Sequence, residues 1–187
     1  MHPVVTPPAR PVGSTLLVAT PRLEDPNFAR TVVLMLEHGG AGSLGVVVNR
    51  PSDTPVAEVL PEWAERMPPG AAVRLGGPVE SDALLAVAAT SGPAEGCTPV
   101  GSHLALVDLD MDPGHLQPSV VPVVFAGYAG WGPGQLGAEL QQGAWWVFPS
   151  LPGDLEIDTP PMWSVVVGRQ RSPAALLSRY PDQPWEN

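Results

Sequence analysis

The chain has 187 residues, of which 44% are hydrophobic, so it is long and apolar enough for one folded domain with a sizeable core. Nineteen carboxylates outnumber nine arginines, there is no lysine, and the formal net charge is −10. Because such a surface repels phosphate groups, we expect neither direct nucleic-acid binding nor attachment to an anionic membrane.

Residues 1–13 form a Pro-rich segment, which predicts a flexible leader before a single domain over 14–187. The N-terminus lacks the charged and hydrophobic regions of a signal peptide, and no apolar run approaches the length of a membrane span. We therefore expect a cytoplasmic protein. Its one cysteine, Cys97, cannot form an internal disulfide, and the sequence assigns it no role.

Apolar runs predict the first strands. Thr15–Ala19 is one, and Thr31–Leu36 is a second that we expect to be buried on both faces, because its apolar residues do not alternate with polar ones. The glycine-rich segment Gly39–Gly42 predicts a hairpin loop, from which Leu44–Asn49 returns as a third strand.

This hairpin sorts the nearby polar residues into two groups. Antiparallel pairing places Glu37 and His38 at the loop end, and Arg30, Asn49 and Arg50 at the other, roughly 20 Å away at about 3.3 Å per residue. The hairpin alone therefore cannot gather them into one catalytic cluster. The two guanidinium groups could hold a carboxylate or phosphate, and ordinary salt bridges to nearby carboxylates are the alternative.

The next segment predicts a helix and a strand. Thr54 suits a helix cap and Pro55 a first helical residue, ahead of an apolar stripe at helical spacing. Ala72–Leu75 is predicted to be a strand, and Gly76 and Gly77 after it indicate a turn where the backbone closely approaches another group.

We expect a loop over 91–101, a strand over His103–Val107 and then a solvated acidic turn over 108–112. The acidic turn does not fit a helix–loop–helix calcium site, because Pro113 and Ser119 stand where that site needs glycine and glutamate. The four histidines have no zinc-ligand spacing, and there is no Gly-x-Ser-x-Gly motif. We expect no metal and no cofactor.

The richest stretch follows a strand predicted over Val120–Phe125. Four glycines within eight residues predict a turn, and Pro133 suits the first position of a helix that Gly143 ends. Gln135 and Glu139 form an i,i+4 pair on this helix. A glycine-rich turn before a helix could bind an anion, but neither nucleotide-binding motif is present, which favours tight packing beneath the neighbouring aromatic residues.

Three elements complete the chain. We predict a strand over Trp145–Phe148 and a helix carrying Met162 and Val166 on its apolar face, with its start at Asp158-Thr159-Pro160-Pro161. Ser172-Pro173 suits the start of a last short helix. Strands that mostly do not alternate with helices indicate the α+β class.

Six segments follow one another from about Ser14 to the end: Leu17-Val-Ala-Thr-Pro21, Asp25-Pro-Asn-Phe28, Gly45-Val-Val-Val-Asn-Arg-Pro51, Leu75-Gly-Gly-Pro-Val79, Gly127-Tyr-Ala-Gly-Trp-Gly-Pro-Gly-Gln-Leu136 and the tail Tyr180–Asn187. In these segments the chain resembles the YqgE/AlgH family of bacterial proteins. The resemblance implies a mixed β-sheet that bifurcates and curls into a pseudo-barrel, with helices packed outside and a strand over Ala83–Ala89. The family is largely uncharacterised biochemically, and its name suggests at most an indirect regulatory role.

Two functions remain open. The first is a non-catalytic module that binds a small anion or a protein partner, with seven candidate ligand-binding residues: Arg30, Asn49, Arg50, Gly76, Gly77, Gln135 and Glu139. The alternative is an enzyme of unknown reaction whose site is assembled from five polar residues: His38, Asn49, Arg50, Gln135 and Glu139.

Overall fold

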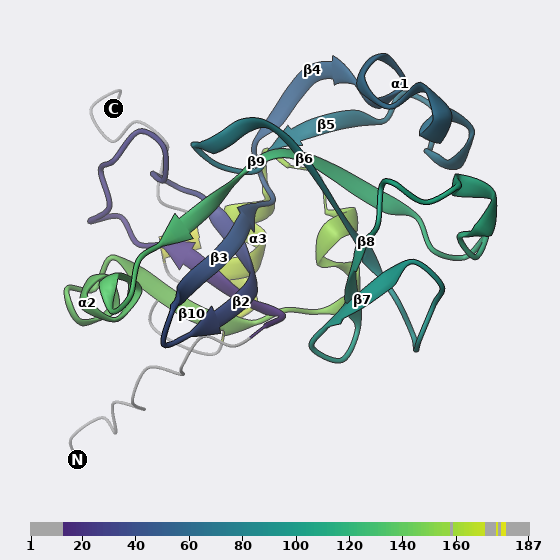
Figure 1. Cartoon of the computed structure of the whole chain (residues 1–187). Helices are drawn as coiled ribbons and strands as arrows, with labels where there is room; N and C mark the ends of the chain where they lie inside the picture. The colour runs from purple at the N-terminus through teal and green to yellow at the C-terminus, as the bar shows by residue number, and fades with distance from the viewer. Residues whose placement is uncertain (1–12, 158, 171–174, 176, 179–187) are drawn as a thin grey trace.

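In the computed structural model, which describes residues 13–157, 159–170, 175 and 177–178, a branched sheet carries short helices (Figure 1). The strands are β1 Thr15–Ala19, β2 Val32–Gly39, β3 Gly42–Val47, β4 Pro51–Pro55, β5 Ala72–Leu75, β6 Val79–Ala89, β7 Cys97–Val100, β8 Leu104–Val107, β9 Pro122–Trp131 and β10 Trp145–Pro149. The α-helices are α1 Val56–Val59, α2 Gln135–Gln141 and α3 Met162–Gly168, and the 3₁₀ helices are η1 Pro61–Arg66, η2 Pro113–His115 and η3 Pro152–Glu156.

The sheet branches at β9. Its main path runs β10-β1-β2-β3-β9-β6-β8-β7, all antiparallel, and β5 joins β9 in parallel while pairing with β4 on its other side. The α+β class and the mixed, bifurcated sheet are confirmed. Within the described residues the end strands β10 and β7 do not pair, so the sheet stays open and does not close into a barrel.

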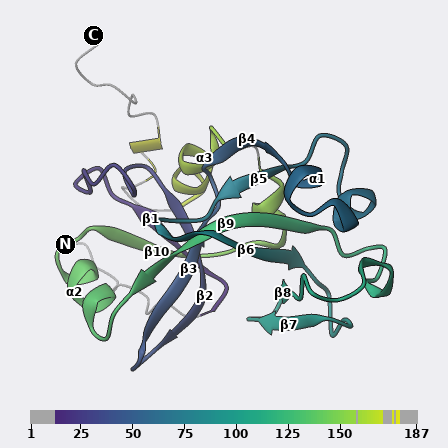
Figure 2. The ribbon, with the colours of Figure 1, turned by 45° about the horizontal axis from the view of Figure 1, so that its top comes forward.

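The inner strands are buried on both faces, as their unbroken apolar runs predict. Along β2, Val32 and Leu34 pack into one hydrophobic cluster with α3 and η3, whereas Val33 and Met35 pack into another beneath α2. Successive side chains of a strand point to opposite faces, which explains the division. Figure 2 shows α2 and α3 on opposite sides of these strands.

The glycine-rich turn predicted after Phe125 starts later than expected, because β9 continues to Trp131 and the chain turns only over 132–134. Gly127 keeps a left-handed φ of 68° inside the strand, where an added Cβ would lie 2.6 Å from the carbonyl oxygen of Gly77. The glycine thus serves close packing. Helix α2 starts later than predicted, with Gly134 and not Pro133 at its N-terminal boundary, and Gly143 follows its end with a φ of 75°.

Two other local predictions are wrong. Strand β4 extends to Pro55, so Thr54 caps no helix, and α1 is a single turn before Pro61 begins the 3₁₀ helix η1. Proline explains this change because it removes a backbone donor from a continuing α-helix. The loop predicted over 91–101 contains the edge strand β7.

Helix α3 matches the predicted helix, with Met162 and Val166 buried. The leader before Gly13, the cap predicted at Asp158 and the helix predicted from Ser172-Pro173 lie outside the described residues. Of the helices described, none has the length and apolar character needed to cross a membrane.

Candidate functional site

Asn49 ties two backbone segments together. Its side-chain oxygen accepts the N–H of Val32 at 2.8 Å, and its Nδ2 donates to the carbonyl oxygen of Arg30 at 2.9 Å. The amide therefore fixes the start of β2 to the chain leaving β3. Both functional atoms of this predicted site residue are already bonded to main-chain groups.

The two arginines beside it also contact the protein. Nη2 of Arg50 donates to the carbonyl oxygens of Ala29 at 3.0 Å and Pro26 at 3.2 Å, which anchors the loop before β2. Arg30 has a left-handed φ of 55°, and its guanidinium carbon lies 4.6 Å from the ring centroid of Trp163 in a cation–π contact. The structure brings Arg30, Asn49 and Arg50 together, as the hairpin predicts.

Gly76 and Gly77 lie where β5 meets β9. A Cβ at Gly76 would lie 2.2 Å from the carbonyl oxygen of Gly127, and one at Gly77 would lie 2.2 Å from the backbone of Tyr128. The amide N–H of Gly76 donates to Ala126 at 2.8 Å. Close approach is confirmed, and the group that approaches is another strand of the same sheet.

The side chains of Gln135 and Glu139 contact each other on α2. Nε2 of Gln135 donates to Oε1 of Glu139 at 3.0 Å. The other carboxylate oxygen, Oε2, accepts the indole N–H of Trp131 at 2.9 Å and that of Trp145 at 2.8 Å. Phe28 stacks on one indole and meets the other edge-on. Three donors thus hold the carboxylate of Glu139 within an aromatic cluster.

His38 lies at the opposite end of the hairpin from Asn49, again as predicted. Its Nδ1 is 2.7 Å from the hydroxyl oxygen of Ser43, the residue directly across the strand pair. Ser43 also pairs with Trp131 of β9. The hairpin holds His38 apart from Asn49 and Arg50, so the five residues proposed for an enzyme site do not meet in one place.

No group of three or more His, Cys, Asp or Glu side chains gathers to hold a metal ion in the part of the chain that the structure describes. Cys97 packs, partly buried, against the cluster formed by η1 and the β6–β9 pair, and burial raises the pKa of its thiol. Burial, with a further contribution from the nearby Glu80 carboxylate, raises the pKa of Tyr128. Neither group is activated as a nucleophile by these shifts.

A cleft of about 530 Å³ opens beside the branch point of the sheet, and the sequence analysis missed it. Most of its lining is apolar, and we name it the branch cleft: Pro51, Ser52, Val56, Met67, Pro68, Pro69, Gly70, Ala71, Ala72, Val73, Arg74, Ala89, Val121, Pro122, Val123, Val124, Leu155, Glu156, Ile157 and Thr159.

Strand divergence explains the branch cleft. β5 pairs with β9 only through Arg74 and Leu75, opposite Phe125 and Ala126. Upstream of that pair, 71–73 and 121–124 form separate walls of the cleft. Figure 1 shows β4 and β5 diverging from β9 toward α1. No local sequence pattern signals this gap, because it depends on where two strands distant in sequence stop pairing.

A sequence model described as AlgH-like matches residues 16–175. The chain belongs to this family. Among its AlgH-like relatives, a UPF0301 protein of Streptomyces coelicolor is 48% identical over 180 residues, covering 92% of this chain and 93% of the relative. A UPF0301 protein of Rhodococcus erythropolis is 42% identical, covering 95% of this chain and 90% of the relative.

Two solved structures share the fold. The crystal structure of a Corynebacterium diphtheriae protein superposes with a TM-score of 0.85 at 32% identity, covering 94% of this chain and 95% of the other. The solution structure of AlgH from Pseudomonas aeruginosa gives a TM-score of 0.68 at 30% identity, covering 95% and 100%. These matches confirm the YqgE/AlgH resemblance.

A histidine–serine contact in this AlgH-like chain also escaped prediction. Nε2 of His103 lies 3.0 Å from the hydroxyl oxygen of Ser150, which itself donates to the carbonyl oxygen of Ser14. While the hydroxyl of Ser150 donates its one proton to Ser14, it can only accept a hydrogen bond from His103. Ser150 is therefore a structural link between β10 and the start of β1.

Proposed function

We propose that this AlgH-like protein is a non-catalytic binding module that holds an extended segment of a partner protein in the branch cleft. The supporting observation is the cleft itself. Its volume of about 530 Å³ falls within the range of about 300–1,000 Å³ usual for ligand sites, and a mostly apolar lining with a few polar groups is typical of them. Two extended segments, 71–74 with part of β5 and 121–124 with the start of β9, flank it and suit an elongated ligand.

A small anion is the second candidate, and the arginine contacts weaken it. Arg50 donates to two carbonyl oxygens, and in the cleft Arg74 donates to the carbonyl oxygens of Val48 and Leu155, both at 2.9 Å. An anion would have to compete with these bonds. The separation of His38 from Asn49 and Arg50 likewise gives an enzyme site little support.

The net charge of −10 supports a partner that is neither nucleic acid nor a membrane surface. We place the module in the cytoplasm, and any effect on transcription would be indirect, through the bound protein.

Selection from a library of random heptapeptides displayed on phage tests the proposal. Ala72 is exposed and lines the cleft, so Ala72→Trp should fill it without disturbing the core. Ala138 is exposed on α2, and Ala138→Trp is the matched control. We expect selected peptides to bind the parent and Ala138→Trp equally, and Ala72→Trp at least tenfold more weakly, in fluorescence anisotropy.

Selected peptides that bind all three proteins equally, or a failure to enrich any peptide, would overturn the proposal. A thermal-shift screen with phosphate, nucleotides and small carboxylates addresses the second candidate, because a ligand of the folded state raises the midpoint. A rise that disappears in Arg50→Ala would favour the anion instead.

A further inference from the structure

One edge of β9 is open in the branch cleft. The N–H of Gly76 donates to the carbonyl oxygen of Ala126 at 2.8 Å, so Ala126 directs its main-chain groups toward β5. Main-chain groups of residues two apart in a strand point to the same edge, so Val124 and Pro122 direct theirs to that side as well. The ladder with β5 stops before it reaches these two residues.

Two groups of this edge would continue the ladder: the N–H of Val124 and the carbonyl oxygen of Pro122. In the part of the chain that the structure describes, no strand pairs with either group on the β5 side. Both residues are buried and both line the cleft. Because a buried main-chain group without a partner destabilises the folded state, a ligand that supplies an acceptor and a donor here gains affinity.

The spacing of these two groups fits a parallel strand. In a parallel pair, one residue donates its N–H to a carbonyl oxygen of the neighbouring strand and accepts the N–H of the residue two positions later. Pro122 and Val124 hold these two positions on either side of Val123. One residue of a ligand strand parallel to β9 can therefore bond both groups.

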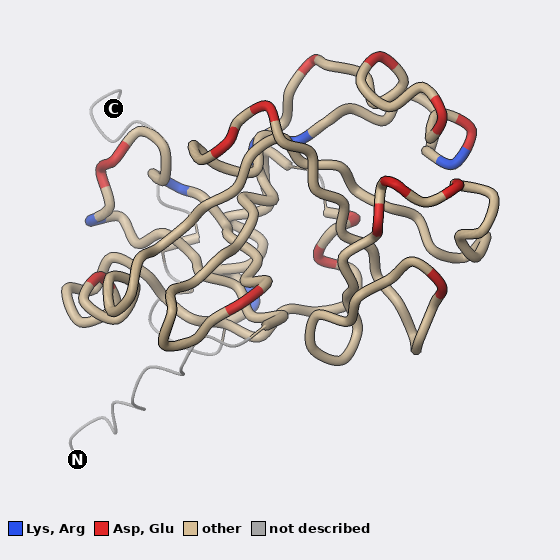
Figure 3. The backbone as a smooth tube through the Cα atoms, viewed as in Figure 1, with Lys and Arg blue, Asp and Glu red and all other residues tan. Residues whose placement is uncertain are grey.

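The lining of the cleft favours an uncharged, apolar ligand strand. The described lining includes one glutamate and one arginine, and two carbonyl oxygens hold the guanidinium group of that arginine. Figure 3 shows no charged position along β9. Val73 and Val124 belong to the hydrophobic cluster of α1 and η1, whereas Val123 packs against that of α3. Successive side chains of an added strand would enter these two apolar surroundings in turn.

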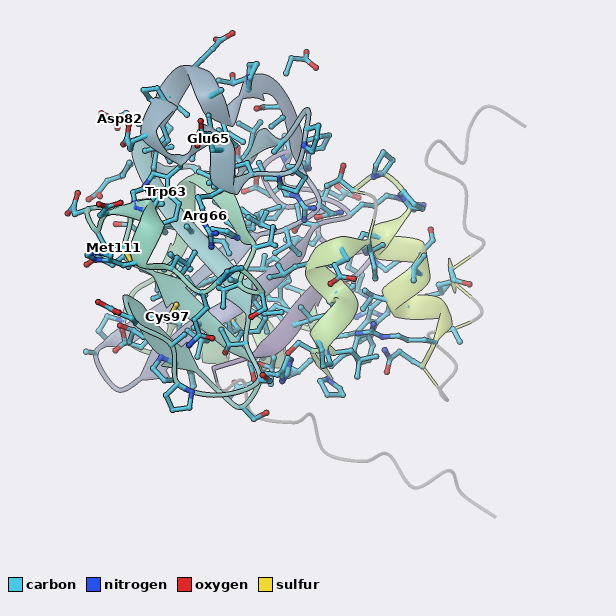
Figure 4. The ribbon with its side chains drawn as sticks, turned by 90° about the vertical axis from the view of Figure 1, so that its right-hand side faces the viewer. Trp63, Glu65, Arg66, Asp82, Cys97 and Met111 are labelled. Atoms are coloured by element: carbon cyan, nitrogen blue, oxygen red, sulfur yellow. The ribbon has the colours of Figure 1, made fainter. Side chains whose placement is uncertain are left out.

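Side chains of η1 anchor the outer wall of the cleft. Fully buried Trp63 donates its indole N–H to the carbonyl oxygen of Leu109 at 3.1 Å. Nη2 of Arg66 donates to the carbonyl oxygens of Leu116 at 2.9 Å and Gln117 at 2.8 Å. Figure 4 shows Trp63 and Arg66 on the same side of the molecule. The cleft-lining segment that follows η1 is thus tied to the chain before β9, and a preformed cleft loses less entropy when a ligand binds.

We propose that the branch cleft binds an uncharged, apolar segment of the partner protein as an added β-strand, parallel to β9, whose main chain bonds Pro122 and Val124. The inference rests on the proposed function and specifies how the partner is recognised. Main-chain hydrogen bonds supply affinity, and alternate side chains in the two apolar surroundings supply specificity. The added strand continues the ladder that β5 leaves unfinished.

Single N-methylation of a bound peptide tests the strand pairing, because each methyl group removes one main-chain N–H. The probe is the tightest-binding heptapeptide from the phage selection, made in seven singly N-methylated versions. In fluorescence anisotropy we expect the methyl group at the residue that donates to Pro122 to weaken binding at least tenfold. At its two neighbours, whose N–H groups point to the opposite edge, we expect losses below threefold.

Amide hydrogen exchange tests the open edge without a ligand. Val123 and Phe125 direct their N–H groups to β6, so the N–H of Val124 should exchange at least tenfold faster than theirs in the free protein. Saturating heptapeptide should slow exchange at Val124 at least tenfold. The same peptide concentration should leave it unchanged in Ala72→Trp, which is the control.

Losses that do not alternate along a peptide that Ala72→Trp still blocks would overturn the strand pairing and leave the proposed function standing. Exchange at Val124 as slow as at Val123 in the free protein would also overturn it, because the edge would then be closed. A consensus of selected peptides with charged side chains at its centre would overturn the uncharged, apolar strand. If the selection enriches no peptide that Ala72→Trp blocks, both proposals fail.

Discussion

A single oxygen atom of Glu139, Oε2, accepts the indole N–H groups of both Trp131 and Trp145, at 2.9 and 2.8 Å. Both tryptophans are buried, with 5% and 4% of their surfaces exposed, and water can therefore satisfy their N–H groups poorly. The carboxylate thus joins the end of β9 to the start of β10.

Glu139→Ala should lower the free energy of unfolding by roughly 2–4 kcal/mol, because each buried donor left unpaired costs about 1–3 kcal/mol. Glu139→Gln keeps an acceptor oxygen, so its free energy of unfolding should fall by less than half as much. Urea unfolding followed by far-UV circular dichroism measures both. Glu37→Gln, at an exposed carboxylate, is the control, and equal losses for the alanine and glutamine variants would refute this account.

Asn49→Ala should lower the free energy of unfolding by about 2–3 kcal/mol, because it removes two hydrogen bonds and leaves the N–H of fully buried Val32 unpaired. Amide hydrogen exchange at Val32 should accelerate in the same variant. Asn27→Ala, in the exposed turn before β2, should change stability by no more than about 0.5 kcal/mol. Unchanged protection at Val32 would show that Asn49 does not hold this strand.

Gly76→Ala should prevent β5 from docking on β9, because its Cβ would overlap the carbonyl oxygen of Gly127 at 2.2 Å. We expect loss of cooperative unfolding or a large fall in the thermal midpoint. Gly137→Ala is the matched control: no atom lies within 4 Å of its added Cβ, and within α2 it should stabilise the protein by about 0.5–1 kcal/mol. A tolerated Gly76→Ala would contradict the role assigned to this contact.

Stability should fall as pH rises above about 9. The pKa of Cys97 lies above its ordinary value of 9.0 in the folded protein, so the folded state retains a proton that the unfolded state releases. The stabilisation is complete below the unfolded pKa and is lost as pH rises through the folded pKa. The raised pKa of Tyr128 lowers stability in the same direction as pH rises above the ordinary tyrosine value of 10.0. Urea midpoints measured between pH 8 and 10.5 give the dependence of stability on pH, which Cys97→Ala should reduce. An unchanged dependence in that variant would show that Cys97 is not its cause.

The sequence predicts those elements whose signals are local. Thr15–Ala19 and Ala72–Leu75 coincide with β1 and β5, because apolar runs bounded by turn residues are typical of strands. Gly127 misleads for a tertiary reason: it resembles a turn residue, yet it lies within β9, where the carbonyl oxygens of Gly77 and Val79 leave no room for a Cβ. Only the partner strand reveals which role a glycine has.

In the candidate site, too, some contacts follow from local sequence spacing and others depend on the tertiary structure. The Gln135–Glu139 pair follows from helical spacing, but its bonds to two tryptophans depend on strands that flank α2 in space. Clustering of Arg30 with Asn49 and Arg50 follows from the hairpin, whereas the carbonyl groups that occupy Arg50 come from a loop of irregular structure. Ligand binding by these residues stays a prediction.

The position of β1 in the sheet has a consequence for biosynthesis. β1 lies between β2 and β10, and Ala19 pairs with Trp145, more than 120 residues later. At about 5–20 residues per second, a ribosome needs roughly 6–25 s to supply that partner. Until then one edge of this apolar strand stays open to pairing with other nascent chains, so chaperone demand should be greatest before β10 leaves the exit tunnel.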